Sequence, residues 1–410
     1  MTLLQLDGTV SSTTPPPPPT AEFPLWRLGF RPFFLAGAVF AILSVALWIA
    51  AYLGALPQAL STWNPLGGWL GWHQHEMPFG VATAIVAGFL LTVVQNWTGQ
   101  PGLHGKPLII LVSLWCAARL CWLTGLPWAF AAATGLAFLL FLAYVTGRIL
   151  WKVKQKHNYL APCTVLLLAL ADALALAGVA SGNSDWQYNA AMAAIWLIVA
   201  LMTMIGGRVI PFFTQMGLRR PDAITSWLWL DAALMAGALM VAILTALGDG
   251  REPQPAFALV FAALAVGHAV RLGRWYDAGI WRVPLLWSLH LACLWMVVGF
   301  AGLALFHGGW LASSSYALHA LTVGAMGGLI LAMISRVSLG HTGRPLQAPA
   351  AMSWAFILLN LATVARVFIA PWHYPAALTL AAVCWTAAFG LFTWHYAPML
   401  CRARVDGRPG

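Results

Sequence analysis

The residues of this sequence best suited to chemistry are eleven histidines, most of them within or beside long apolar segments. An ionisable side chain in such a segment is costly to bury and marks a candidate functional site. The densest group is His73 and His75, in the run Trp72–Met77 (WHQHEM). Positions two apart on a helix point about 200° from each other, so these imidazoles cannot chelate one metal but could serve two centres. The alternative is an interfacial aromatic belt with solvated histidines.

An internal repeat relates His75 to a third histidine, His319. The segment His75–Gly80 (HEMPFG) aligns with His319–Gly324 (HALTVG). Two imidazoles at one depth on different helices are what bis-imidazole ligation of a haem requires. We therefore predict that His75 and His319 bind a haem, and that His73 is a candidate ligand of a second centre.

Two further histidines, His268 and His290, lie in apolar segments nearer the opposite end and could form an inner metal site. The alternative for each is a hydrogen bond to a backbone carbonyl between helices. Two arginines, Arg119 and Arg366, also lie inside apolar segments. Haem propionates would suit them, because a guanidinium pairs well with a carboxylate; packing against helix carbonyls is the alternative.

The elements that must position these residues are transmembrane helices. Hydrophobic residues make up 61% of the 410-residue chain and charged residues only 8%, whereas a soluble protein carries roughly 25% charged residues. The apolar runs are long enough to cross about 30 Å of hydrocarbon and do not alternate as barrel strands do. We predict an all-α polytopic membrane protein with twelve spans, near 32–56, 78–96, 107–125, 127–148, 158–180, 187–207, 224–247, 256–271, 283–306, 312–335, 349–370 and 373–397.

The basic residues orient these spans. With a cytoplasmic N-terminus, 18 of the 21 Lys and Arg lie on the cytoplasmic side; Arg251 falls in an outer loop, and Arg119 and Arg366 lie inside spans. This distribution follows the positive-inside rule and places both termini in the cytoplasm. It also explains the net charge of +10 without a nucleic-acid partner.

The chain is predicted to form one membrane domain, residues 26–400, between two short tails. Residues 1–25 are proline-rich and expected to be disordered, without a basic-then-apolar signal peptide, and residues 401–410 form a short basic tail. Spans one, five and nine each begin near a proline, namely Pro32, Pro162 and Pro284, which suits a first helical turn. Together with the histidine repeat, this predicts three copies of a four-helix unit.

Several motifs together resemble the NnrS family. They are Arg31–Leu35 (RPFFL), Trp72–Met77 with Gly80, Ala87–Thr92 (AGFLLT), Asn96–Gly99 (NWTG) and Gly340–Arg344 (GHTGR). The resemblance runs from about residue 25 to residue 400. It implies a bacterial inner-membrane protein of twelve helices that holds haem and copper and is linked to nitric oxide, in denitrification or in relief of nitrosative stress.

The helix arrangement is also similar to that of the haem-copper oxidase and nitric oxide reductase superfamily, where histidines on spans two and ten hold a low-spin haem. Only His75 and His319 carry over from that pattern, with His73 as a candidate for the second centre. Spans six and seven contain no histidine, so the superfamily's second-metal ligands have no counterparts. A second metal would need other residues, such as His268 and His290.

The sequence thus predicts a membrane protein with b-type haem and copper that handles nitric oxide, a small apolar molecule that partitions into lipid. If it is an enzyme, it is an oxidoreductase acting on nitric oxide; reduction, oxidation and simple binding stay open. The electron donor also stays open, because no C-x-x-C-H motif is present. The alternatives are a secondary transporter, which usually shows inverted repeats and midplane carboxylates, and a haem- or copper-handling assembly factor for a respiratory enzyme.

Overall fold

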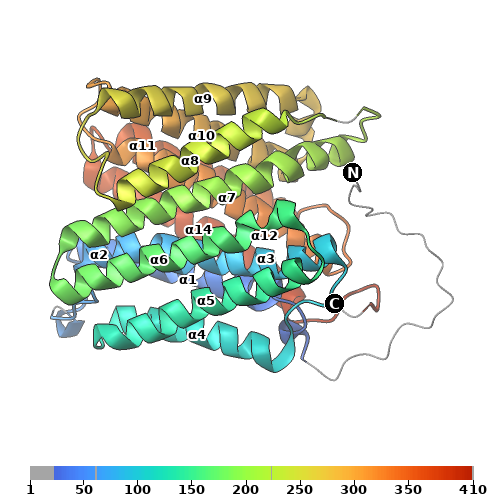
Figure 1. The fold of residues 1–410 in the computed structure, drawn as a ribbon, viewed down its shortest axis with the longest axis horizontal. Helices are drawn as coiled ribbons and strands as arrows, with labels where there is room; N and C mark the ends of the chain where they lie inside the picture. The colour runs from blue at the N-terminus through green and yellow to red at the C-terminus, as the bar shows by residue number, and fades with distance from the viewer. Residues whose placement is uncertain (1–22, 61, 223, 409–410) are drawn as a thin grey trace.

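The computed structural model of the chain describes residues 23–408, apart from 61 and 223. All regular structure in these residues is helical, and the helices run along one common direction (Figure 1). Twelve of the described helical segments are long and apolar enough to cross a membrane. The predicted all-α, twelve-span membrane architecture is therefore confirmed.

The spans follow one another along the chain with short connections. The first six are Phe30–Tyr52 (α1), Gly68–Thr98 (α2, η3 and α3), Gly105–Thr124 (α4), Trp128–Lys152 (α5), Lys156–Ser181 (η4 and α6) and Ser184–Leu218 (α7). The last six are Leu228–Ala246 (α8), Pro255–Trp275 (α9), Pro284–His307 (α10), Ser315–His341 (α11, η6 and α12), Ala350–Ile369 (α13 and η7) and Tyr374–Leu400 (α14). Short 3₁₀ turns cover Pro24–Trp26 (η1), Gln58–Leu60 (η2) and Ala278–Arg282 (η5).

Spans two and six exceed their predicted lengths the most. Span two begins at Gly68 because its polar first turns, α2 (Gly68–His75), are helical although they are not apolar. Span six continues to Leu218 as one helix of 35 residues, about 52 Å at 1.5 Å per residue. Its inner turns stay ordered because Arg208 Nη1 donates to Asn158 Oδ1 at 2.6 Å. Hydropathy alone therefore misses the polar helical turns at the start of span two and at the end of span six.

Three spans form the centre of the bundle. In spans two, six and ten, 78%, 83% and 61% of the most apolar window is buried within the protein, whereas no other described span exceeds 50%. These three occupy the same position in each predicted four-helix unit. The threefold repeat itself stays a prediction, but central placement of its second helix is what such a repeat would produce.

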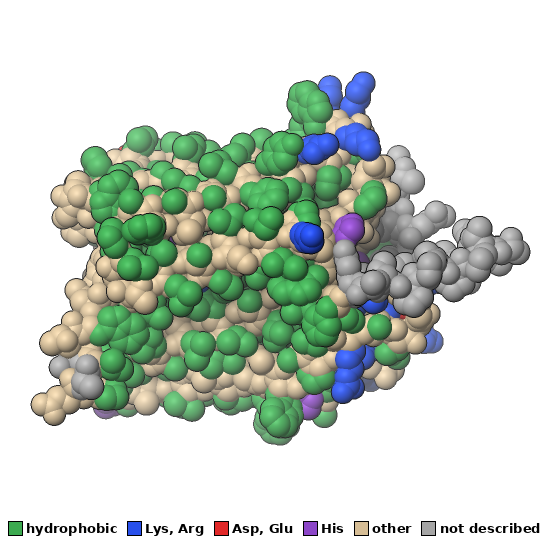
Figure 2. All heavy atoms as spheres, turned by 90° about the horizontal axis from the view of Figure 1, so that it is seen from below, with side chains coloured by type: hydrophobic (Ala, Val, Ile, Leu, Met, Phe, Trp, Pro, Cys, Tyr) green, Lys and Arg blue, Asp and Glu red, His purple; other side chains and the backbone are tan. Residues whose placement is uncertain are grey.

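The two ends of the bundle differ in charge. Lys and Arg side chains gather at one end, which we call the basic end (Figure 2). The start of α1 meets the end of α14 there, because Arg31 Nη1 donates to the carbonyls of Leu400 and Arg402 at 2.9 and 2.7 Å. We call the opposite end the outer end, after the predicted orientation, which stays a prediction.

The structure describes most of the predicted C-terminal tail but little of the N-terminal one. Residues 1–22 of the proline-rich tail lie outside the described residues. The described part of the basic C-terminal tail packs against the end of span ten, where Val405 N donates to Thr342 O at 3.2 Å. Gly343 has a positive φ of 75°, and a Cβ there would lie 2.8 Å from Asp406 Cγ. Glycine in the GHTGR motif therefore makes room for this tail.

Three spans are interrupted by π-helical segments in their outer halves. These are η3 (Glu76–Ala82), η6 (Ala320–Gly327) and η7 (Ala365–Ile369). The first two begin directly after His75 and His319, and Pro78 contributes to η3 because it has no N–H to donate. Wide turns of this kind are frequent at functional sites, and all three border the cavity described next.

Candidate functional site

A cavity of about 330 Å³ lies in the outer half of the bundle, between spans one, two, six, ten, eleven and twelve. Sites for small molecules have volumes of about 300–1,000 Å³ and combine apolar walls with a few converging polar groups. Most of this wall is apolar. The polar side chains that line it include His73, Gln74, His319, Arg366 and Tyr374. We call it the outer cavity.

His319 presents one ring nitrogen to the outer cavity. It ends α11 (Ser315–His319), and its Nδ1 lies 2.7 Å from the carbonyl oxygen of Ser315, one turn earlier. A donor bond from Nδ1 places the proton there and leaves the lone pair on Nε2, the arrangement usual for metal-ligating imidazoles. The hydrogen bond of Nδ1 is the one that the described residues make to this ring.

His73 lines the same cavity from span two. Its ring stacks on Trp48 of α1, with centroids 4.0 Å apart and planes 19° apart, which fixes its orientation. Its Nδ1 is buried and has no hydrogen-bond partner within the described chain. His319 and Arg366 line the same cavity. Two histidines from different spans thus share one cavity.

Arg366 of η7 is the only charged side chain in the cavity wall, as far as the chain is described. Its Nε and Nη1 atoms are buried without partners, and Nη2 makes only two long contacts of 3.4 Å, with Ser315 Oγ and Tyr374 Oη. A buried guanidinium in a membrane is costly unless an anion accompanies it. A carboxylate entering the outer cavity would supply that anion.

His75 points away from this cavity. Its Nδ1 lies 2.8 Å from Glu76 Oε1 and its Nε2 2.7 Å from Asp172 Oδ1 of α6. Its ring stacks on Trp122 with centroids 3.6 Å apart. Both ring nitrogens are engaged by carboxylates, so neither is free for a metal. The structure brings His319 together with His73 rather than with the predicted partner His75, because the two side chains leave opposite faces of α2.

Arg119 belongs to the His75 group as well. Its Nη1 donates to Glu76 Oε1 at 2.7 Å. A Cβ on Gly80 would lie within 3.1 Å of both side chains, so glycine permits this close contact. Arg119 therefore already has its carboxylate, unlike Arg366, and is not placed to meet a propionate in the outer cavity. We call Glu76, His75, Asp172 and Arg119 the ionic cluster.

The predicted inner metal site is not assembled. The two ring nitrogens of His290 face the carbonyls of Leu286 and Trp275 at 3.0 and 3.4 Å, which is the backbone-bonded alternative. The ring of His268 stacks on Phe300, and its Nε2 is buried without a partner. No group of three or more His, Cys, Asp or Glu side chains in the described residues is arranged to hold a metal ion.

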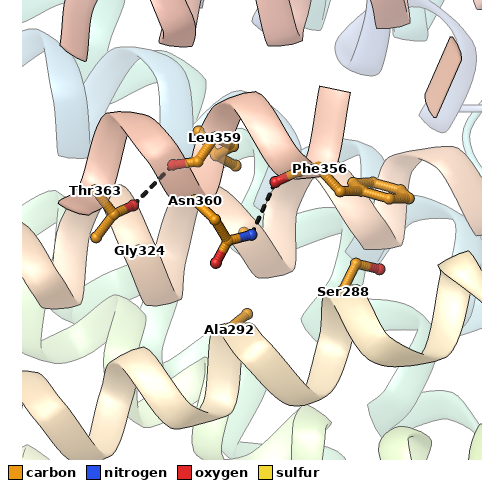
Figure 3. A pocket seen from close by; sticks show the side chains of 8 residues that line it. Ser288, Ala292, Gly324, Phe356, Leu359, Asn360 and Thr363 are labelled. Carbon is orange, nitrogen blue, oxygen red and sulfur yellow. Dashed lines mark hydrogen bonds between the residues drawn. The ribbon is translucent and has the colours of Figure 1, made fainter. Parts of the chain in front are cut away.

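A small pocket lies between α10, η6 and α13 (Figure 3). It measures about 10 Å³, enough for about one water molecule. Asn360 of α13 bridges its wall, accepting from Trp295 Nε1 and donating to Phe356 O, both at 2.8 Å. A Cβ on Gly324 would lie 2.5 Å from Trp295 Cγ. Glycine therefore lets η6 pack closely against α10.

The sequence contained a signal for one feature that the prediction missed. Met77 follows His73 by four residues, which is one helical turn, and it lines the outer cavity as that spacing implies. The ion pairs in the structure show which intramembrane arginine has no acidic partner. Glu76 pairs with Arg119, Asp172 with His75, and Asp231 with Arg271 at 3.1 Å. None remains for Arg366.

Comparison with known proteins identifies one family. Residues 24–404 match the family model for NnrS, described as NnrS protein, which is nearly the whole chain. No curated protein matches this sequence. The match includes every span that borders the outer cavity and both members of its histidine pair.

Proposed function

Since this chain belongs to the NnrS family, which is linked to nitric oxide, we propose that it holds a b-type haem in the outer cavity and handles nitric oxide there. The observation that carries the proposal is that His73 and His319 line one cavity together with Arg366, which has no carboxylate partner among the described residues. Helical rather than barrel spans favour the bacterial inner membrane as its location.

The donor set of the outer cavity fits a haem. His73 and His319 would hold the haem, and the guanidinium of Arg366 could pair with a propionate. Since His319 Nδ1 is held by Ser315 O and the ring of His73 by Trp48, both rings are fixed before a ligand arrives. The apolar remainder of the wall excludes water.

A haem held by these residues would supply redox chemistry towards nitric oxide. The chain's own part is to orient the two imidazoles, to neutralise one carboxylate through Arg366, and to keep the site dry within the bilayer, where nitric oxide concentrates. Reduction, oxidation and reversible binding all remain compatible with this arrangement, as does an unidentified electron donor.

We also propose that copper binds beside the haem, in the outer cavity rather than at His268 and His290. The thioethers of Met77, Met192 and Met326 line its wall. Thioether and imidazole donors suit Cu(I). We expect Met77→Leu to lower the copper content of the purified protein while the haem content stays unchanged. Unchanged copper in this variant would contradict that placement.

The test of the haem proposal is a dithionite-reduced minus oxidised visible spectrum of the detergent-purified protein, expressed with ample haem. A sharp α-band of b-type haem is expected. It should disappear in His73→Ala and in His319→Ala. The matched control is His290→Ala, which removes a buried imidazole bonded to backbone carbonyls and should keep the band.

Other outcomes would favour the alternatives. A featureless spectrum from the wild-type protein would overturn the haem proposal and leave a secondary transporter as the leading function. Substoichiometric haem or copper that exchanges freely with a chelator would favour a haem- or copper-handling assembly factor. A full band in both His73→Ala and His319→Ala would refute the ligand pair.

A further inference from the structure

A second chamber lies inward of the outer cavity, in the centre of the bundle. It measures about 90 Å³, lies between spans one, two, six and ten, and is partly open. Only apolar side chains and Gly206 line it; most of these residues are buried, and the others, such as Phe89 and Met202, are half-buried. We call it the inner chamber.

The inner chamber adjoins the outer cavity directly. Ala82, Met326 and Ile330 line both spaces. Ala82 ends η3 and Met326 lies in η6, so the two π segments that follow the histidines also form the partition. Methionine is unbranched and flexible, so Met326 can move aside at little cost. The partition is therefore thin and deformable.

We propose that the inner chamber binds one small apolar molecule, of the size of a diatomic gas, and passes it to the outer cavity. A water molecule in a cavity needs two to four polar partners, and an apolar cavity of this kind stays dry and accepts guests such as xenon. The chamber offers no such partners. It offers instead a wall of branched aliphatic, methionine and phenylalanine side chains at van der Waals contact.

The inference deepens the proposed function and rests on it for the identity of the natural guest, nitric oxide. A chamber next to the outer cavity would hold the gas at high local concentration beside the two imidazoles. It would also explain why spans two, six and ten enclose an apolar void at the centre, where interiors are otherwise close-packed.

The test is a crystal structure of the full chain under xenon pressure, which needs neither haem nor activity. Xenon density is expected in the inner chamber of the wild-type protein. Gly206→Leu should abolish it, because a Cβ at Gly206 meets only Ile210 Cδ1, at 3.4 Å, and a longer side chain would fill the void. The matched control is Gly390→Leu in α14, where a Cβ meets no atom within 4 Å, and it should keep the xenon.

Passage to the outer cavity is tested separately in the haem-loaded protein. Carbon monoxide, which must displace one imidazole to bind, is photolysed from the reduced haem, and its rebinding is followed. Ala82→Leu should slow the bimolecular phase and leave the α-band unchanged. An unaltered rate would refute the passage.

The two proposals fail in distinguishable ways. Ordered water, or no density, in the inner chamber of wild-type crystals under xenon would refute the chamber as a gas site, whatever the haem spectrum shows. Xenon in the chamber of a protein with no haem band would support the gas site while the haem proposal failed.

Discussion

The two faces of helix α2 differ in whether their polar side chains have partners within the protein. On one face of α2, His75 has both ring nitrogens bound by carboxylates, and Glu76 is also bound by Arg119. On the other face, His73 and the nearby Arg366 bury nitrogen atoms without partners. Buried polar groups are normally satisfied, and the first face comes closer to that condition, although Glu76 Oε2 and Arg119 Nε are also buried without a hydrogen bond. The difference is that the arginine of the first face has a carboxylate partner, whereas Arg366 has none among the described residues.

The difference separates a stabilising cluster from a binding site by a physical criterion. The ionic cluster joins α2 and η3 to α4 and α6 and so fixes the helix that carries His73. The outer cavity keeps an unsatisfied cation and two imidazoles in a low dielectric, where an anionic, metal-containing ligand would gain the most. Substitutions on the two faces should therefore affect different quantities.

The largest contrast is expected between the two intramembrane arginines. Arg119→Gln leaves Glu76 as a buried carboxylate without its cation, and breaking such a pair costs about 3–5 kcal/mol. Arg366→Gln removes an unpaired cation, so we expect unchanged or higher stability without haem, together with weaker haem retention. Thermal unfolding of the haem-free variants in detergent, followed by tryptophan fluorescence, measures the first effect.

Haem content after gel filtration measures the second effect. Arg366→Lys is the matched control, because it keeps the charge and should restore part of the haem content. Equal destabilisation by Arg119→Gln and Arg366→Gln would remove the distinction between the two faces.

The two histidines give the next contrast. His75→Ala removes the ring that contacts Asp172, and a buried acceptor left without a donor costs about 1–3 kcal/mol, more if it is charged. His73→Ala removes a ring whose Nδ1 makes no hydrogen bond and loses only its stacking on Trp48, so it should lower the unfolding temperature less than His75→Ala does. Haem per folded molecule should fall in His73→Ala and persist in His75→Ala. The reverse pattern would restore His75 as the haem ligand.

The sequence was sufficient for the architecture but not for this choice between histidines. Apolar run length predicts twelve spans, since hydrocarbon thickness sets a minimum length that each run meets. The repeat aligned His75 with His319 along the backbone. However, side-chain direction changes by about 100° per residue on a helix, and η3 and η6 alter the local turn. A pairing based on alignment therefore placed the imidazole on the wrong face of α2 for the outer cavity.

The missing partners of the buried charges were equally hard to predict. Pairing Glu76 with Arg119 requires knowing that span two packs against span three with Gly80 between the side chains. Asp172 is 97 residues from His75 in the chain. Long-range contacts of this kind depend on helix packing, which hydropathy does not encode.

A smaller effect is expected at the glycines of the repeat. Gly324→Ala would place a Cβ 2.5 Å from Trp295 Cγ, so the side chain or η6 must shift. Overpacking of this kind costs about 1–3 kcal/mol, and we expect the lower part of that range because the tryptophan side chain can adjust. If the shift reaches His319, the α-band should broaden or lose intensity. Gly390→Ala, with open space around its Cβ, is the control that should leave both stability and spectrum unchanged.

The smallest effect on stability is expected at an exposed ion pair, that of Arg404 and Asp406. In the C-terminal tail, Arg404 donates two hydrogen bonds to the carboxylate of Asp406. They run from Nε to Oδ1 at 2.9 Å and from Nη2 to Oδ2 at 2.5 Å. These hydrogen bonds lower the pKa of Asp406 from 3.8 to about 2. A carboxyl whose pKa is lower in the folded state stabilises the fold above its unfolded value, and that contribution disappears as the pH falls through the folded value. Asp406→Asn should therefore lower stability above about pH 4, with the difference from wild type vanishing towards about pH 2.

The stability loss caused by Asp406→Asn tests whether burial determines how much each ion pair contributes to the stability of the protein. The Asp406 side chain is 33% exposed, whereas Glu76 is fully buried. Solvent screening limits exposed pairs to about 0–1 kcal/mol, so Asp406→Asn should shift the unfolding temperature far less than Arg119→Gln does. Thermal unfolding of wild type and Asp406→Asn at neutral and acidic pH gives the comparison. A loss at neutral pH as large as that of Arg119→Gln would mean that the tail, through Val405 and Thr342, anchors the basic end as firmly as the ionic cluster anchors α2.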